Sequence, residues 1–225
     1  MATYAFIHGA GGSAWDWHLV AAALCERGHR TVTVDLPCED DSVGLAGSAD
    51  VVADAVVAAV GAPTDLVVVA QSLGGFTAPL VCERLPVDLM VLLAAMTPVP
   101  GEAAGDWWAN TGHGQVFGDM AEWDEVELFS HDVPVALQEE SLLHRRDQSG
   151  TPMAEPFPLP AWPDVPTRYL LCRDDRLFPA EWNRRVVQDR LGITPVEIPG
   201  SHCAYLSQPT LIADHLHAFW TDLHP

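Results

Sequence analysis

A serine between small residues is the strongest chemical signal in the sequence. The stretch Ala70-Gln71-Ser72-Leu73-Gly74 follows the apolar run 66–70 and precedes a helical pattern, and it matches G-x-S-x-G with alanine in the first position. In this motif the serine occupies a strained turn from strand to helix, so residues two positions away must be small. The turn exposes the hydroxyl and directs the N–H groups at the helix start toward it. An ordinary turn from strand to helix also matches this five-residue motif by chance. The catalytic interpretation therefore requires a base and an acid elsewhere in the chain.

A serine hydroxyl is a weak nucleophile at its ordinary pKa, so a base is expected elsewhere in the chain. His202 is the best candidate, because its loop follows the last predicted strand, 195–198, and α/β folds place catalytic groups at strand ends. We expect His8 to anchor the first glycine loop and the other histidines to be surface or packing residues. The orienting acid is expected after another strand, where Asp174 and Asp175 follow the run 167–172.

The two neighbouring carboxylates remain alternatives on this reasoning. One of them must turn toward His202 to fix its tautomer and to stabilise the imidazolium form. The other is expected to cap or to form a salt bridge, because two buried, unshared carboxylates side by side are costly.

The stretch from Gly9 to Ala14 allows two interpretations. It fits G-x-G-x-x-A, and Asp35 ends a second apolar run about twenty residues later, which is the pattern of a dinucleotide site. However, the run Trp15-Asp16-Trp17 follows at once, and an acidic side chain with two bulky rings is poorly suited to a diphosphate. The glycines instead fit a loop that brings an N–H beside the reacting serine.

The sequence resembles the α/β-hydrolase superfamily, in particular its small-lidded branch of plant methylesterases, hydroxynitrile lyases and bacterial esterases. The resemblance rests on HGAGGSAWDW, GHRTVTVDLP, AQSLGG, CRDDRLFP and GSHCAYLSQP, and the order serine, aspartate, histidine agrees with it. It implies that Asp175 is the acid, with Asp174 as second choice. It also implies that the backbone N–H groups of Ala10 and Leu73 form an oxyanion hole.

The alternation of apolar runs and helical patterns predicts an α/β fold: a mostly parallel sheet with helices on both faces. The expected strands are 4–7, 31–34, 66–70, 89–93, 167–172 and 195–198, and the expected helices are 15–27, 48–60 with Ser48 as N-cap, 74–84, 179–191 and 208–223. We expect one domain over 1–225, with a core of 1–97 and 167–225. The segment 98–166, which no motif covers, is expected to be an inserted lid.

Composition excludes several classes of function. With 31 acidic and 11 basic residues the net charge is −20, which argues against nucleic acid and anionic membrane surfaces as partners. All eleven basic residues are arginine, and the absence of lysine removes Schiff-base enzymes, Ser–Lys dyads, P-loops and the Tyr-x-x-x-Lys pair of dehydrogenases. Five scattered cysteines, no membrane-length apolar run and no signal-peptide pattern predict a cytoplasmic protein with free thiols.

The sequence thus predicts a serine hydrolase that acts on carboxylic esters of small, largely apolar molecules, without metal or organic cofactor. Trp107, Trp108 and Trp123 of the expected lid either line the substrate pocket or pack the lid on the core. The alternatives are a lyase, a C–C hydrolase, a cofactor-free haloperoxidase or a non-catalytic receptor on the same scaffold. Lyases of the similar branch have a lysine after the catalytic histidine, and Cys203 here weighs against cyanohydrin cleavage. The oligomeric state stays open.

Overall fold

A six-stranded parallel sheet forms the centre of the molecule. The computed structural model describes residues 1–117 and 124–223. The sheet has the order β2-β1-β3-β4-β5-β6, and every neighbouring pair is parallel. The strands are β1 (Thr3–Ile7), β2 (Arg30–Thr33), β3 (Leu66–Gln71), β4 (Leu89–Leu93), β5 (Thr167–Cys172) and β6 (Val196–Ile198). The predicted α/β class and its parallel sheet are confirmed.

The three central strands are buried at every position. Apart from Thr3 and Gln71 at their ends, strands β1, β3 and β4 consist of apolar and aromatic residues, as expected where helices cover both faces of a parallel sheet. The register pairs Ile7 with Ala70 and Gln71 with Leu93. The carboxyl ends of these strands therefore lie at one edge, and the chain segments that follow them are brought together.

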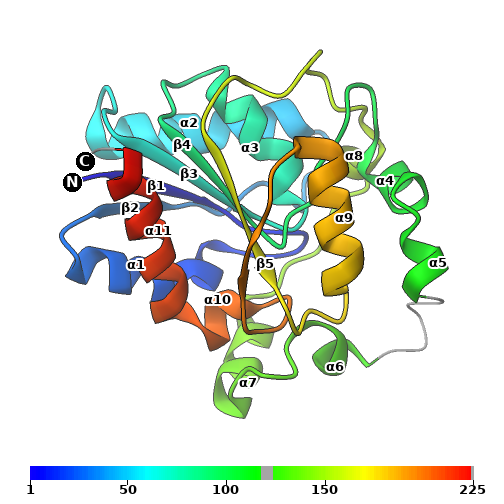
Figure 1. Cartoon of the computed structure of the whole chain (residues 1–225). Helices are drawn as coiled ribbons and strands as arrows, with labels where there is room; N and C mark the ends of the chain where they lie inside the picture. The colour runs from blue at the N-terminus through cyan, green and yellow to red at the C-terminus, as the bar shows by residue number, and fades with distance from the viewer. Residues whose placement is uncertain (118–123, 224–225) are drawn as a thin grey trace.

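Two layers of helices enclose the sheet. Helices α1 (His18–Glu26) and α11 (Pro209–Leu223) pack on each other on one face, while α2 (Leu45–Val60) and α3 (Gly74–Cys82) cover the other and α9 (Ala180–Leu191) packs against β5 (Figure 1). Helix α11 buries Ile212, Ala213, Leu216 and Phe219, the spacing of a one-sided amphipathic helix. The hydroxyl of Tyr4 in β1 donates to the carbonyl of Leu216 at 3.0 Å, which ties the last helix to the sheet.

The segment between β4 and β5 contains short helices and no strand among its described residues. These helices are α4 (Ala104–Asn110), α5 (His113–Phe117), α6 (Glu125–Phe129), α7 (Val135–His144) and α8 (Thr151–Ala154). Figure 1 shows α6 and α7 beyond one end of the sheet, near α10 (Ala204–Ser207). The boundaries 98–166 and the role of this segment as a lid stay predictions.

Two helix starts differ from the sequence-based prediction. Helix α2 begins at Leu45, not after Ser48, and the Ser48 hydroxyl donates to the carbonyl of Gly44 from inside the first turn. The Leu45 N–H is instead capped by the Glu155 carboxylate at 2.6 Å, a contact from a distant part of the chain that no local pattern shows. The predicted helix 15–27 divides into the 3₁₀ turn η1 (Ala14–Trp17) and α1.

Gly75, the second residue of α3, allows this helix to approach the backbone after β4. A Cβ atom at position 75 would lie 1.9 Å from the carbonyl oxygen of Met96. We expect Gly75→Ala to lower the free energy of unfolding by about 3 kcal/mol, because either helix α3 or the backbone at Met96 must move. The matched control is Gly114→Ala in α5, where a Cβ atom would meet nothing within 4 Å. Urea unfolding measures both, and equal effects would show that the close approach at Gly75 does not constrain the fold.

Candidate active site

Ser72 turns the chain from the central strand into α3. Its φ is 51°, in the left-handed region that non-glycine residues rarely adopt and that costs about 1–3 kcal/mol. Its carbonyl accepts hydrogen bonds from the N–H groups of Gly75 at 3.1 Å and Met96 at 2.9 Å, which hold this conformation. Ser72 is half-buried between two buried neighbours. The predicted strand–turn–helix context of the serine is confirmed.

Two glycines make the turn possible, because neighbouring side-chain and backbone atoms lie against them. A Cβ atom on Gly9 would lie 2.9 Å from the Ser72 Cβ atom and 2.4 Å from Oε1 of Gln71. A Cβ atom on Gly74 would lie 2.9 Å from the Ile7 side chain and 3.0 Å from the carbonyl oxygen of His8. The loop after β1 therefore passes directly beside Ser72.

His8 anchors this loop, as predicted. Its Nδ1 donates to the carbonyl of Gly9 at 2.8 Å, and its Nε2 accepts from the N–H of Leu36 at 3.0 Å. Since Nε2 acts as an acceptor, the ring is neutral, and burial lowers the pKa of His8 in agreement with this. The side chain thus joins the ends of β1 and β2.

The N–H groups that a dinucleotide would use are occupied by carboxylates. The N–H of Ser13 donates to Asp16 Oδ2 at 3.2 Å, and the N–H of Ala14 donates to Asp35 Oδ1 at 2.8 Å. Burial raises the pKa of Asp16 to about 6. The segment between β4 and β5 also covers the loop, since the N–H of Arg146 donates to the carbonyl of Gly11 at 2.9 Å. These contacts disfavour the dinucleotide interpretation of the glycine pattern.

Two backbone N–H groups beside Ser72 have no partner within 1–117 and 124–223. They belong to Ala10, which follows Gly9 and is exposed, and to Leu73, which follows Ser72. Both residues flank the close contact between the loop and the turn. Unpaired N–H groups at such a position are able to donate hydrogen bonds to a reacting oxygen atom and so stabilise the negative charge that develops on it.

His202 and Asp175 form a buried pair at the ends of two other strands. The His202 Nδ1 lies 2.8 Å from Asp175 Oδ2, and the two side chains are 4% and 0% exposed. The second oxygen of Asp175 accepts from the N–H groups of Leu177 at 2.9 Å and Phe178 at 2.8 Å. These donors stabilise the buried carboxylate, which keeps a proton on Nδ1 and leaves Nε2 of His202 as the free basic nitrogen.

Asp174 points away from the imidazole. Its Oδ2 accepts from the N–H of Gly200 at 2.9 Å, its own N–H donates to the carbonyl of Gly200 at 3.1 Å, and the residue is exposed. Sequence spacing does not distinguish the two carboxylates as partners of His202, whereas the geometry pairs Asp175 with His202. Asp174 instead fixes the loop that carries the histidine.

The histidine loop contacts the serine turn through Gln71. The Nε2 of Gln71 donates to the carbonyl of His202 at 3.3 Å, a contact that the serine motif does not reveal because Gln71 stands at its variable position. The rings of Phe178 and Phe129 pack on the imidazole, with centroid distances of 4.9 and 5.8 Å. The Ser72 hydroxyl forms no hydrogen bond with any residue that the structure describes.

Of the three tryptophans predicted to line the pocket or to pack the lid, one lies in the core, one is half-buried and one lies outside the described residues. Trp107 is 1% exposed, its Nε1 donates to the carbonyl of Thr97 at 3.2 Å, and its ring packs against Phe178 and Trp182. It therefore packs the segment between β4 and β5 on the core. Trp108 is half-buried beside Phe178, and Trp123 lies outside the described residues.

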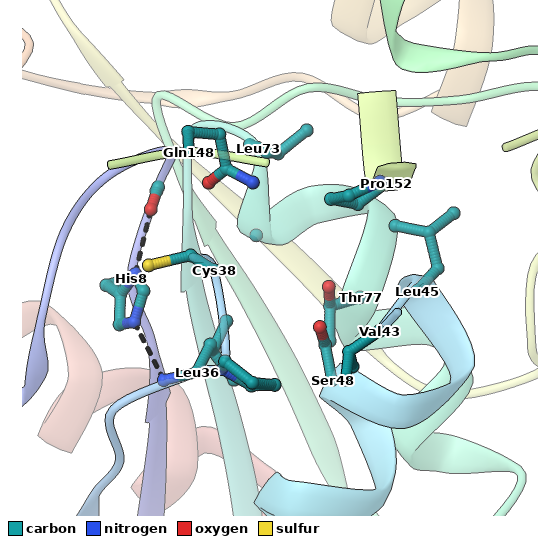
Figure 2. A pocket seen from close by; sticks show the side chains of 13 residues that line it. His8, Leu36, Cys38, Val43, Leu45, Ser48, Leu73, Thr77, Gln148 and Pro152 are labelled. Carbon is teal, nitrogen blue, oxygen red and sulfur yellow. Dashed lines mark hydrogen bonds between the residues drawn. The ribbon is translucent and has the colours of Figure 1, made fainter. Parts of the chain in front are cut away.

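A narrow pocket with room for little more than one water molecule lies beside Leu73 and Gly9. In Figure 2, Ser48 and Thr77 line the pocket below Leu73 and Gln148. It is lined by His8, Gly9, Leu36, Pro37, Cys38, Val43, Leu45, Ser48, Leu73, Gly74, Thr77, Gln148 and Pro152. None of these side chains is an acid, a lysine or an arginine. Sequence patterns did not indicate this pocket, because its lining comes from five separate stretches of chain.

Residues 1–117 and 124–223 contain no group of three or more His, Cys, Asp or Glu side chains arranged to hold a metal ion. Within them no helix has the length and apolar composition needed to cross a membrane.

Comparison with known proteins gives one family and several esterases. The sequence profile of the alpha/beta hydrolase family matches residues 5–215. Probable esterase PIR7A of Oryza sativa subsp. indica is 41% identical over 112 residues, which cover 45% of this chain and 42% of that protein. Esterase PIR7B of Oryza sativa subsp. japonica is 35% identical over 111 residues, with 45% and 41% covered. The matched part thus spans less than half the length of these relatives.

Solved structures match nearly the whole chain. Polyneuridine aldehyde esterase has a TM-score of 0.80 at 20% identity, with 97% of this chain and 99% of that chain covered. A pyrethroid hydrolase from Sphingobium faniae has a TM-score of 0.79 at 23% identity, with 98% and 97% covered. The methylesterase MES16 from Arabidopsis has a TM-score of 0.76 at 18% identity, with 98% and 99% covered. At these identities the likeness shows the fold alone.

The neutral state of His8 predicts a pH dependence of stability. Because burial lowers its folded pKa below the ordinary value of 6.5, its contribution is present above pH 6.5 and is lost as pH falls toward the folded pKa. We expect His8→Ala to lower the free energy of unfolding at neutral pH, where two hydrogen bonds disappear. That deficit should shrink below pH 6.5, by at most about 1.4 kcal/mol per pH unit.

Urea unfolding of both proteins at pH 7.5 and pH 5.5 measures this difference. The other histidines are common to both proteins, so their titration cancels in the comparison. A deficit that stays constant or grows toward pH 5.5 would contradict a neutral, buried His8.

Proposed function

Because the chain belongs to the alpha/beta hydrolase family, we propose that it hydrolyses carboxylic esters of small, largely apolar molecules. In this proposal Ser72 is the nucleophile, His202 the base and Asp175 the acid that orients the base. The observation that carries the proposal is the buried hydrogen bond between His202 and Asp175, because it leaves a free basic nitrogen in a loop that contacts the residue before the strained serine. The esterase names of the relatives agree with this reaction class.

The first step forms an acyl-enzyme. Nε2 of His202 takes the hydroxyl proton as Ser72 Oγ attacks the acyl carbonyl carbon, and the electron pair of the C=O bond moves to its oxygen. Asp175 stabilises the resulting imidazolium. The N–H groups of Ala10 and Leu73 hold the oxyanion, and each such donor contributes about 3 kcal/mol to transition-state stabilisation.

The second half of the reaction releases both products. As the oxyanion collapses, the bond to the alcohol oxygen breaks and that oxygen takes the proton from His202. A water molecule then attacks the acyl carbon while His202 takes one of its protons. Collapse of this second intermediate expels Ser72, which recovers its proton from His202, and the acid leaves.

The side chains around Leu73 and Gly9 favour an uncharged substrate. The narrow pocket there is lined by aliphatic side chains, hydroxyls and an amide, and it lacks acidic side chains, lysine and arginine. The net charge of −20 also disfavours anionic substrates at a distance. The partner in this proposal is therefore a small neutral ester. We also propose a cytoplasmic location, which the five free cysteines support.

Hydrolysis is favoured over the lyase alternative by the residue after the base. Burial raises the pKa of the Cys203 thiol to about 12, so that this side chain is neutral at physiological pH. Cys203 thus supplies no positive charge, whereas the similar lyases have a lysine at this place.

Covalent labelling tests the activated serine. A fluorophosphonate should give a single adduct on Ser72 by mass spectrometry, because only a serine beside a free base is nucleophilic enough to react. We expect Ser72→Ala to abolish the label and to lower kcat/KM for p-nitrophenyl acetate on the order of 10⁴- to 10⁶-fold. Ser42→Ala, at an exposed serine outside the site, is the control. Absence of label on the wild type would refute the nucleophile. Label without turnover of any ester would point to the lyase or receptor alternatives.

The neighbouring aspartates provide a matched pair of variants. Asp175→Asn should lower kcat about 10⁴-fold, because an amide at this position donates to Nδ1 and favours the wrong tautomer. Asp174→Asn should leave kcat within about tenfold, since an amide oxygen still accepts from the N–H of Gly200. Steady-state kinetics on a p-nitrophenyl ester compares the two, with circular dichroism to verify folding. A larger loss of kcat in Asp174→Asn than in Asp175→Asn would show that Asp175 is not the acid.

A further inference from the structure

The loop that carries His202 is held by a carboxylate from the segment between α6 and α7. The Oδ2 of Asp132 accepts from the N–H of Ser201 at 3.1 Å and from the hydroxyl of Ser207 at 2.7 Å. These two donors lie on either side of His202. No sequence pattern indicated Asp132, because it is separated from its donors by about seventy residues.

A second contact from the same segment holds the other side of the histidine. The N–H of Cys203 donates to the carbonyl of Phe129 at 2.9 Å, and the Phe129 ring packs on the His202 ring. The N–H groups immediately before and after His202 are therefore both held by residues 129–132. This segment and the catalytic loop move together unless these hydrogen bonds break.

Asp132 contacts the histidine loop through one carboxylate oxygen only. Its Oδ1 is buried and has no hydrogen-bond partner within the described ranges. An amide oxygen is able to accept the same two hydrogen bonds as Oδ2. Both hydrogen bonds of Asp132 therefore act on Ser201 and Ser207, the residues that flank His202.

We propose that Asp132 is a positioning residue that sets the distance between the His202 imidazole and Ser72. The inference rests on the proposed function of His202. Because Asp132 lies between α6 and α7, it makes the placement of the base depend on the inserted segment. In an enzyme, a misplacement of about 1 Å at the reacting groups costs on the order of 10²-fold in rate.

Three variants separate positioning from general folding effects. Asp132→Ala removes the acceptor, and Asp132→Asn retains it. Asp124→Ala is the matched control: this carboxylate caps α6 in the same segment, accepting from Val126 N–H at 2.9 Å and Glu127 N–H at 3.2 Å, and within the described ranges it forms no hydrogen bond with the histidine loop. We expect Asp132→Ala to lower kcat ten- to a hundred-fold with KM within about twofold. Asp132→Asn should restore kcat to within about threefold, and Asp124→Ala should match the wild type.

A spectroscopic readout keeps the test independent of ester turnover. The Nδ1 proton of His202, bonded to Asp175, gives a low-field ¹H resonance that His202→Gln removes. It should broaden or vanish in Asp132→Ala and persist in Asp132→Asn and Asp124→Ala. If Asp132→Ala does not fold, Asp132→Glu keeps the charge but displaces the loop by one methylene, and it should show the same loss of kcat and of the resonance.

Three results would overturn the positioning role. These are an unchanged resonance and kcat in Asp132→Ala, an equal effect of Asp124→Ala, or a rise in KM alone. Failure of the proposed function is distinct, because it would appear as a wild-type protein that shows the resonance but takes no label on Ser72.

Discussion

Strand β3 ends at Gln71 and helix α3 begins at Gly74, so the chain turns at Ser72 with a φ of 51°. This left-handed residue is unfavourable by itself, and it persists because the surrounding backbone fixes it. The carbonyl of Ser72 is held by two N–H groups, and Gly9 and Gly75 allow the neighbouring chains to approach without a clash. The rest of the site is arranged around this turn. The loop after β1 passes beside it, and the histidine loop reaches it through Gln71.

The parallel sheet explains how residues so far apart in the sequence meet. Ser72 follows β3, Asp175 follows β5 and His202 follows β6, and the carboxyl ends of parallel strands share one edge. The sheet brings the three residues to the same edge, but it does not orient them. Orientation comes from local hydrogen bonds: the N–H groups of Leu177 and Phe178 fix Asp175, and Asp175 fixes the tautomer of His202.

Local patterns were sufficient to predict the strands and the serine turn. Strand β4 was predicted at its observed bounds, because five consecutive buried apolar residues leave no other interpretation. Sequence spacing does not decide whether Asp174 or Asp175 pairs with His202, since both follow the same strand. The path of the loop at 200–203 decides it. The start of α2 was wrong for a similar reason. Its cap is Glu155, which no sequence window around Leu45 contains.

The segment between β4 and β5 was the least predictable part of the chain. Its helices are short, and α7 has no buried residue, so the apolar periodicity that identifies longer helices is weak there. Trp107 illustrates the ambiguity, because a tryptophan is suited both to lining a pocket and to packing in a core. Only the hydrogen bond from its indole N–H to the carbonyl of Thr97 shows that it packs in the core. The contacts of Asp132 and Gln148 with the core are likewise tertiary. They follow from where the segment crosses the loops, which depends on the whole fold.

In the proposed mechanism, Ser72, His202 and the N–H groups of Ala10 and Leu73 converge on one reacting centre. A crystal structure of the protein after reaction with a fluorophosphonate measures this convergence. We expect phosphorus bonded to Ser72 Oγ, with one phosphonyl oxygen about 2.7–3.1 Å from the N–H groups of both Ala10 and Leu73. We also expect Nε2 of His202 within hydrogen-bond distance of Ser72 Oγ. A phosphonyl oxygen turned away from both N–H groups, or phosphorus on another residue, would show that these groups do not share one reacting centre.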